Sequence, residues 1–437
     1  MEVLEKALSQ RLDRFDLTLI DVLTETMKWL QWGRFFGPLS GHQRKITEEA
    51  KRYILTVFAY GTGLGPSQAA RAIPDITARQ IAFINQRHIT AEKLEAAIRE
   101  IINAYNRFAL PKCWGDGKYA AADGTQWDVY ENNLLSERHI RYGGYGGIAY
   151  YHVSDTYIAL FSHFIPCGVW EAIYILDGLM RNESDIQPDT LHGDTQAQST
   201  PVYALAFLLG IKLLPRIRNW KKLRFYKADS SHNYRHINDL FTHERIDWAL
   251  IARHLPDMFQ VAQSIKAGVI SPSTILRKLG TASRKNRLYY AFRELGRVIR
   301  TISLLEYLTD ADLQRLVNAM TNKTELFHDF AKWAYFAEDT IQENVRDEQV
   351  KIIKYNHLIA NLLIFHNVYS MTRILNELES KGVVITPEML SALSPFRTAH
   401  INRFGIYELR DREVDEINYA LEIMANKDWQ AAQTQRH

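Results

Sequence analysis

The sequence predicts a mixed α/β fold in which one mixed sheet, with helices on its faces, is embedded in a largely α-helical chain. Three observations carry this prediction. Runs with strand-like alternation occur between residues 117 and 165. Helical and strand-like segments then alternate up to about residue 230, an order typical of a sheet covered by helices. Elsewhere, apolar residues recur every three or four positions, as on the buried face of a helix.

The size and composition of the chain indicate a large globular protein. Its 437 residues suggest two to four units at a typical ~150 residues each. Hydrophobic residues make up 46% of the chain, so extensive disorder is not expected. Cys113 and Cys167 form no metal-binding pattern and fit a reducing, cytosolic compartment. The sequence has neither a secretion signal nor a run of ~18 apolar residues, so we expect no membrane span.

Residues 1–110 are predicted to be helical, because segments such as "LTLIDVLTETMKWLQW" carry apolar residues at helical spacing. Within this region, "GPSQAARAIPDITARQIAFINQR" contains two short helical patterns around Pro74 and Asp75. Two helices joined by a short turn occur in scaffolds and also in helix-turn-helix DNA-binding motifs. Both interpretations stay open, so this region is expected to act as a scaffold or as a DNA contact.

Residues 111–230 are predicted to hold the sheet. Strands are expected in "KYAAADGTQWDVY", "GGIAYYHVS" and "YIALFSHFI", followed by an amphipathic helix in "VWEAIYILDGLMRN". A short strand in "DTLHGDT", a buried helix in "PVYALAFLLG" and a strand in "IKLLPRI" complete the order. Strand signals then end. Residues 231–320 are therefore predicted to be an all-helical insertion, 321–345 a core helix and 346–437 a C-terminal helical region.

Basic residues are clustered, although the net charge is only +3. The stretch "KLLPRIRNWKKLRFYK" (212–227) holds seven basic residues and no acidic one, with aromatic residues between them. The stretch "RKNRLYYAFRELGRVIR" (284–300) holds six basic residues and one acid. Such stretches are either solvated helix faces or surfaces that contact a phosphate backbone and stack on bases.

Three acidic residues lie where a two-metal site would need them. Asp123 is in the middle of the first strand, and Asp194 follows a later strand, at the end where α/β sheets place their sites. Glu325 and His328 share the polar face of the helix in "TNKTELFHDFAKWAYF". Carboxylates suit Mg²⁺, and two ions ~3.5–4 Å apart can activate the attacking oxygen and stabilise the leaving oxygen at a phosphodiester. This pattern predicts an RNase H-like core with a nucleotidyl-transfer site.

Each of these carboxylates also has a structural interpretation. Asp123 would be solvated if it lay in a loop or at the end of a strand. Asp194 would cap the helix that follows it. Asn322 and Glu325 match the capping-box pattern at a helix N-terminus. Asp116 is a weaker alternative to Asp123, because the glycines on both sides of it indicate a turn.

The motifs of this chain, in order and over nearly its whole length, resemble those of Tn3-family transposases. The matching segments are "CWGDGKYAAADGTQW", "YILDGLMRNESD", "HGDTQAQSTPVYALAFLLGIKLLPRIRNW", "NKTELFHDFAKWAYF", "KIIKYNHLIANLLIFHNV" and "SPFRTAHINRFGIYEL". Three positions depart from the family pattern: Gly193 precedes Asp194, Gln196 follows the Asp-Thr pair, and Ala197 replaces an expected glycine. These departures leave the carboxylates in place.

The resemblance implies a DDE catalytic triad of Asp123, Asp194 and Glu325, spaced by 71 and 131 residues, in an RNase H-like core. It implies two Mg²⁺ ions, replaceable by Mn²⁺, that cleave transposon 3′ ends and transfer the 3′-OH to target DNA, with replication then giving a cointegrate. His328 is expected to support a metal ligand or to contact the scissile phosphate. The predicted contacts with the DNA backbone are Arg216, Arg218, Lys221, Lys222 and Lys323.

The resemblance also implies double-stranded DNA as the partner, both at transposon ends and at the target, with a homodimer assembled on paired ends. A bacterial cytoplasmic, nucleoid-associated location is expected, with no membrane contact. Family members carry long N-terminal domains that bind terminal repeats, and little precedes the catalytic half here, so a split gene product, a truncated copy and an expressed fragment all stay open. Two other functions also stay open: a catalytically silent DNA-binding or regulatory remnant, and an RNase H-like nuclease without strand transfer.

Overall fold

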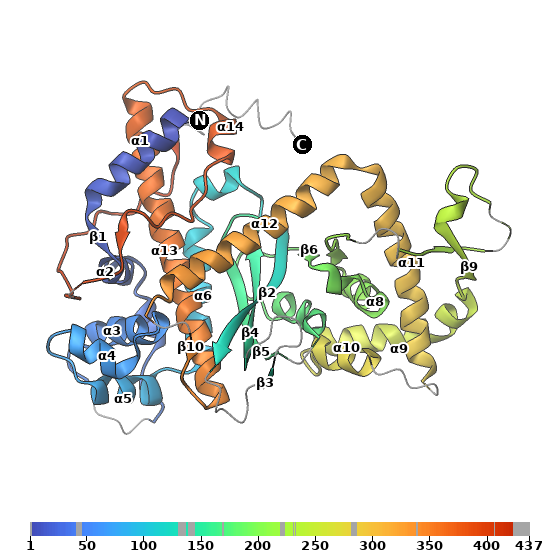
Figure 1. Ribbon diagram of the computed structural model, residues 1–437, viewed down its shortest axis with the longest axis horizontal. Coiled ribbons are helices and arrows are strands. Elements are labelled where there is room, and N and C mark those ends of the chain that lie inside the picture. The colour runs from blue at the N-terminus through green and yellow to red at the C-terminus, as the bar shows by residue number, and fades with distance from the viewer. Residues whose placement is uncertain are drawn as a thin grey trace.

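A mixed sheet lies at the centre of the chain, between two helical parts (Figure 1). The computed structural model describes residues 2–40, 46–129, 137–138, 145–167, 170–218, 223–229, 231, 233–280, 286–337, 340–405 and 407–422.

Within the described residues the sheet has seven strands around β2 (Tyr119–Val129). On one side, β2 pairs antiparallel with β4 (Tyr145–Ser154), which pairs antiparallel with β5 (Ala159–Pro166). On the other side, β6 (Thr190–Gly193) is parallel to β2, and β7 (Lys212–Leu213) is parallel to β6. Two short strands extend the sheet. β3 (Glu137–Arg138) pairs with β4, and β10 (Thr340–Ile341) pairs with β2. The sheet confirms the predicted mixed α/β class.

Between the strands, the structure agrees with one predicted helix and corrects another. The buried helix α8 (Thr200–Leu209) ends at Gly210, which has a φ of 80° and so takes the left-handed conformation that glycine favours. The amphipathic helix expected in "VWEAIYILDGLMRN" is instead a 3₁₀ turn, η4 (Glu171–Tyr174), and a single turn, α7 (Asp177–Met180). This segment packs closely on the sheet, since a Cβ at Gly178 would lie 2.5 Å from the His152 ring. Tertiary packing here overrides helical periodicity.

The described N-terminal region is helical apart from the short strand β1 (Leu17–Thr18). That strand is parallel to β11 (Ile401–Asn402), so two segments from opposite parts of the sequence lie side by side. The two helical patterns around Pro74 are confirmed as separate helices, α4 and α5. The helices of this region are α1 (Glu2–Leu12), α2 (Leu19–Leu30), α3 (Glu49–Gly61), α4 (Gly65–Ala72), α5 (Ala78–His88) and α6 (Ala91–Tyr105).

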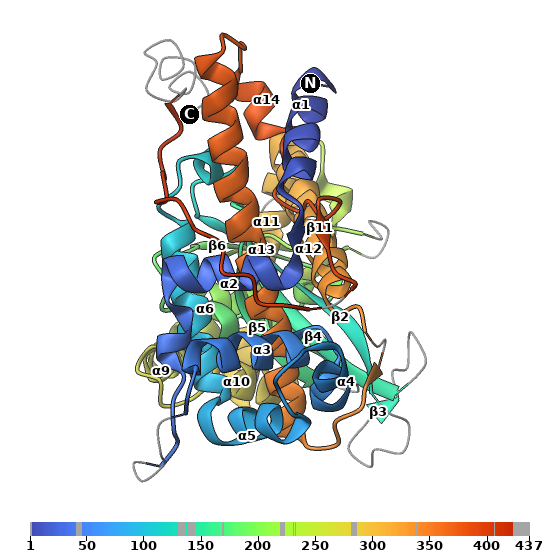
Figure 2. The ribbon, with the colours of Figure 1, turned by 90° about the vertical axis from the view of Figure 1, so that its left-hand side faces the viewer.

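The long helix α13 (Arg346–Ser380) joins the N-terminal helices to the sheet. It packs against α2, α3, α6 and β5 (Figure 2). Of the described helices, α13 alone is long and apolar enough to cross a membrane, but 94% of its most apolar 18-residue window is buried inside the protein. A helix that is apolar all round is normal for a protein core. The short helix α14 (Pro387–Ser391) follows it.

The region between β7 and the core helix extends from the opposite side of the sheet (Figure 1). Its helices are α9 (Trp248–Lys266), α10 (Pro272–Gly280), α11 (Arg287–Thr309) and α12 (Ala311–Ala334). The prediction that residues 231–320 are all helical is wrong at β9 (Phe241–Arg245), which is parallel to β8 (Phe225–Lys227). The ring of Phe241 lies 4.4 Å from that of Tyr234 and 5.7 Å from that of Phe225, so aromatic packing stabilises this strand pair.

Helix α11 docks on α8 through a glycine, which gives a testable prediction for stability. A Cβ at Gly296 would lie 1.8 Å from the backbone oxygen of Thr200, so the two helices would have to separate. We expect Gly296→Ala to lower the free energy of unfolding by about 1–3 kcal/mol in urea titrations, as overpacking typically does. Gly280→Ala is the matched control, because a Cβ there meets nothing within 4 Å. Equal effects of the two changes would contradict the proposed close approach.

Candidate active site

Asp123 and Asp194 lie side by side at one level of the sheet. In the parallel register of β2 and β6, the last pair is Ala122 with Gly193. Asp123 is the next residue of β2, and Asp194 directly follows the end of β6. Parallel neighbours are ~4.8 Å apart, and residues in register point to the same face. The sheet therefore brings these two predicted site residues together.

Helix α12 covers the face to which Asp123 points. Tyr151, the cross-strand partner of Asp123, has its ring centroid 5.1 Å from that of Phe327 and 5.8 Å from that of His328. In Figure 1, α12 crosses in front of β2 and β4. This packing places the polar face of α12 next to the aspartates.

His328 lies behind Asp123. Its side chain is 7% exposed, and its ring forms a hydrogen bond with the Asp123 backbone. Burial lowers the pKa of His328 to about 3, with the charge of Lys332 as a smaller cause. The ring is therefore neutral at pH 7 and positions the strand that carries Asp123. This burial does not suit the predicted contact with a scissile phosphate.

Glu325 lies one turn before His328, on the solvent side of α12. Its side chain is 57% exposed, and its Oε1 atom lies 3.7 Å from Nη1 of Arg216. Arg216 is fixed beside the end of β6, because its backbone N–H donates to the Gly193 carbonyl at 2.8 Å. Its own carbonyl accepts a hydrogen bond from Nε2 of Gln198 at 2.9 Å. Glu325 therefore reaches the region of Asp194 through a basic residue.

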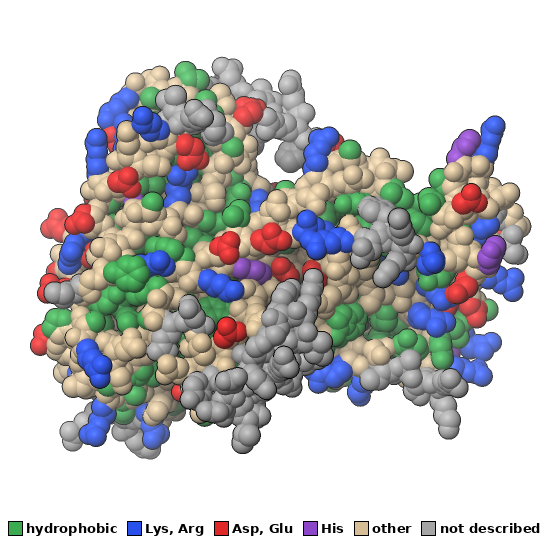
Figure 3. Space-filling model, viewed as in Figure 1, with side chains coloured by type: hydrophobic (Ala, Val, Ile, Leu, Met, Phe, Trp, Pro, Cys, Tyr) green, Lys and Arg blue, Asp and Glu red, His purple; other side chains and the backbone are tan. Residues whose placement is uncertain are grey.

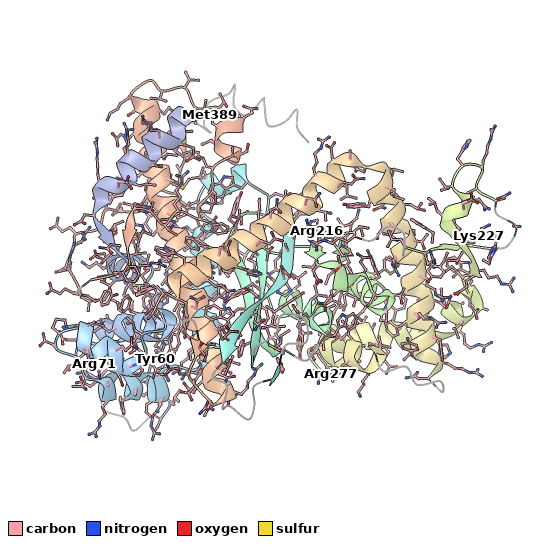
Figure 4. The ribbon with its side chains drawn as sticks, viewed as in Figure 1. Tyr60, Arg71, Arg216, Lys227, Arg277 and Met389 are labelled. Carbon is pink, nitrogen blue, oxygen red and sulfur yellow. The ribbon has the colours of Figure 1, made fainter. Side chains whose placement is uncertain are left out.

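Figures 3 and 4 place this arrangement on one face of the molecule. Acidic side chains gather near the middle of that face, beside Lys and Arg side chains (Figure 3). Arg216 lies next to α12, between the sheet and the segment around β8 that carries Lys227 (Figure 4). The exposed surface at this point thus combines the chemistry of metal ligands with that of phosphate contacts.

The structural interpretations of the three carboxylates have different outcomes. Asp123 is half-buried inside the central strand, so its placement at a solvated strand end is wrong. Asp194 does act as an N-cap, since its side chain accepts the N–H of Gln196 at 2.9 Å. The capping-box interpretation of Asn322 is wrong, because α12 already begins at Ala311.

Of the five predicted DNA contacts, three can be placed, Arg216, Arg218 and Lys323, and two lie outside the described residues. Arg218 is exposed beyond β7, two residues after Arg216. Lys221 and Lys222 fall in the segment that the structure does not describe.

Lys323 is placed differently from its expectation. Its ammonium donates hydrogen bonds to the carbonyls of Trp114, at 3.3 Å, and Asp155, and lies 4.3 Å from the centre of the Tyr157 ring. Burial lowers the pKa of Lys323 to about 8, while the nearby Asp155 carboxylate acts in the opposite direction. Lys323 therefore holds α12 to the loops around β2, and a DNA contact would require breaking these bonds.

Glu171 is a fourth carboxylate that the sequence interpretation missed. A Cβ at Gly124 would lie 2.3 Å from Oε2 of Glu171, so this carboxylate packs against the strand directly after Asp123, on the other face. Burial is the largest cause that raises the pKa of the Tyr150 hydroxyl, and the charges of Asp194, Glu171 and Asp123 raise it further. Tyr150 therefore lies near all three acids. The glycine inside the strand was the available signal, because such a glycine often marks a close approach.

The donor set fits a divalent metal in part. Asp123, on β2, and Asp194, directly after the neighbouring β6, offer carboxylate oxygens, and Mg²⁺ prefers oxygen ligands. Within the described ranges, however, no three His, Cys, Asp or Glu side chains are close enough to hold one ion. The three predicted ligands therefore do not form such a group, and Glu325 is paired with Arg216.

A comparison with known families gives this geometry its context. The family model described as "Tn3 transposase DDE domain" matches residues 21–407, nearly the whole chain. The chain belongs to this family. The match spans β2, β6 and α12, so all three carboxylates lie inside the Tn3 transposase DDE domain.

Individual proteins that are similar to this Tn3 transposase DDE domain are themselves transposases. The chain is 27% identical over 414 residues to "Transposase for transposon Tn1546" of Enterococcus faecium, covering 94% of this chain and 42% of that protein. It is 30% identical to "Transposase for transposon Tn501" of Pseudomonas aeruginosa, covering 92% and 40% respectively. It is 29% identical to "Transposase for transposon Tn3926" of Escherichia coli, covering 90% and 40%. The chain thus spans about two fifths of the length of these relatives.

Proposed function

We propose that this chain is the catalytic region of a DNA transposase that cleaves transposon 3′ ends and joins the freed 3′-OH to target DNA. The observation that carries the proposal is the adjacency of Asp123 and Asp194 where the parallel pairing of β2 and β6 ends, beneath α12, in a Tn3 transposase DDE domain. The strand order β5-β4-β2-β6-β7, antiparallel and then parallel, supports an RNase H-like core.

In this proposal each described site residue has a physical task. Asp123, Asp194 and Glu325 would hold two Mg²⁺ ions, or Mn²⁺ in their place. When bound, such ions activate the attacking oxygen and stabilise the leaving oxygen of the phosphodiester. His328, neutral and buried, holds the backbone of Asp123 and so limits movement of the carboxylate. Gly124 leaves room for Glu171 against the same strand.

Basic residues near the site would bind the substrate. Arg216 and Arg218 lie beside the strand ends, where they would contact the phosphate backbone of double-stranded DNA. Such contacts carry no sequence information, so recognition of transposon ends would need other elements. Residues 1–110 would serve as a scaffold or a second DNA contact. A homodimer on paired ends would align two cuts, and action on DNA would place the protein at the bacterial nucleoid in the cytoplasm.

One assay separates this function from its alternatives. The chain is mixed with precleaved duplexes carrying transposon ends, a target plasmid and Mg²⁺ or Mn²⁺, and the products are resolved on a denaturing gel. Joined end–target products are expected. Nicking without joining would overturn the proposal in favour of an RNase H-like nuclease. A third outcome is that the chain binds DNA, including a branched duplex that resembles the joined product, but neither nicks nor joins it. That outcome would favour a catalytically silent remnant.

A further inference from the structure

One predicted metal ligand, Glu325, has the guanidinium of Arg216 as its partner. The Glu325 carboxylate and the Arg216 guanidinium are 3.7 Å apart, while no described group of three ligands is close enough for one metal ion. A guanidinium is a permanent cation that binds carboxylates well. It therefore supplies the positive charge beside Glu325 that a divalent ion would otherwise supply. The inference that follows rests on the proposed function.

We propose that Arg216 holds Glu325 outside the metal site in the DNA-free chain, and that a DNA phosphate releases it by taking over the guanidinium. Glu325 would then be free to hold metal ions together with Asp123 and Asp194, and Arg216 stays on the phosphate. Arg216 is thus a positioning residue for Glu325 before DNA arrives and a substrate contact afterwards.

The position of Arg216 suits both tasks. Its backbone is fixed to Gly193 and Gln198, directly beside Asp194. Its neighbours Leu214 and Ile217 are buried in a small apolar cluster between α11 and α12, which pins the segment further. The exchange therefore requires movement of the Arg216 and Glu325 side chains, which are 29% and 57% exposed.

The strength of the pair also suits an exchange. Ion pairs that are partly exposed to solvent are weak, so the Glu325 carboxylate can leave Arg216 without a large penalty. Phosphate, by contrast, accepts two parallel hydrogen bonds from a guanidinium and brings its own negative charge. A phosphodiester next to Asp194 would therefore compete effectively with Glu325 for Arg216.

The test measures binding of Mn²⁺ alone to the DNA-free chain, through the electron paramagnetic resonance signal of the free ion. We expect Arg216→Gln to tighten Mn²⁺ binding by about three- to tenfold, because it frees Glu325 and removes a positive charge from the site. Arg216→Lys, which keeps the charge, should stay within about twofold of the parent chain. Unchanged or weaker binding in Arg216→Gln would overturn the proposal.

Two further variants separate release of Glu325 from a general effect of charge. Lys212→Gln removes a cation of the same segment that pairs instead with Glu306 at 3.2 Å, and should leave Mn²⁺ binding unchanged. The gain from Arg216→Gln should also disappear when Glu325 is already glutamine, since the double-mutant cycle isolates their coupling. A gain that persists in the Glu325→Gln background would contradict the exchange.

A DNA readout completes the test. At saturating Mn²⁺, Arg216→Gln should slow the joining reaction at least about tenfold through loss of its phosphate contact, although it binds the metal more tightly. Unfolding cannot produce these opposite signs, and undiminished joining would overturn the second task of Arg216. A separate measurement tests the proposed function itself. If that function is wrong, Asp123→Asn would bind Mn²⁺ as tightly as the parent chain does, whatever the result with Arg216→Gln.

Discussion

Asp123→Asn is expected to abolish both cleavage and joining of DNA while leaving the protein folded. The change removes the negative charge of a central ligand but keeps the shape of the side chain. Metal ions contribute several kcal/mol to stabilising a phosphoryl-transfer transition state, and each 1.36 kcal/mol is a factor of ten in rate. We therefore expect joining to fall by at least about a thousandfold, measured with precleaved ends and a target plasmid.

The local structure explains why the fold should survive this change. Oδ1 of Asp123 accepts a hydrogen bond from the N–H of Gly124 at 2.9 Å, and the Oδ1 atom of asparagine can accept the same bond. The free energy of unfolding should therefore change by less than about 1 kcal/mol in urea titrations.

Asp128→Asn is the matched control for this test. Asp128 lies on the same strand but is exposed, and it accepts a hydrogen bond from Gln126 at 3.0 Å. Joining by Asp128→Asn should stay within about twofold of the parent rate, as surface changes away from the site have small effects. Joining retained by Asp123→Asn would remove Asp123 from the catalytic centre.

Local sequence rules were sufficient to place the two aspartates relative to their strands. Strand alternation gave the face of Asp123, and the position after a short strand gave Asp194 its place at the strand end. Sequence spacing could not reveal that Arg216 holds Glu325, because this pairing depends on how α12 crosses the sheet. Nor could it locate the start of α12, since the capping pattern at Asn322 falls inside a longer helix.

Contacts between distant segments account for what the sequence did not predict. The carboxylate of Glu171 meets Gly124 across 47 positions of the chain, and only the glycine itself hinted at the close approach. Lys323 was predicted to contact the DNA backbone, whereas its partners at Trp114 and Asp155 come from loops far away in sequence. Burial of a charged group is decided by such partners, which periodicity does not encode.

Asp155→Ala is expected to cause the largest loss of stability among single changes around the site. Asp155 is 4% exposed, and its carboxylate accepts the N–H groups of Asp116, at 3.2 Å, and Gly117, at 3.1 Å. The loop wraps closely around it, since a Cβ at Gly115 would lie 2.3 Å from Cγ of Asp155. Burial raises the pKa of this carboxyl to about 6, and hydrogen bonding by Ser154 and the charge of Lys323 oppose this rise.

Alanine would remove the acceptor for these donors and the negative charge beside the Lys323 ammonium. Leaving buried donors and a buried charge unpaired costs about 3–5 kcal/mol in comparable cases. The urea midpoint should fall accordingly, and DNA joining should be lost at the temperature where the variant unfolds. Asp116→Ala, in the same loop, removes an exposed carboxylate that pairs with Lys118 at 3.3 Å and should cost less than about 1 kcal/mol. If Asp155→Ala were as stable as Asp116→Ala, this buried network would not be what fixes the loop before β2, and the position of Asp123 would have to depend on the sheet alone.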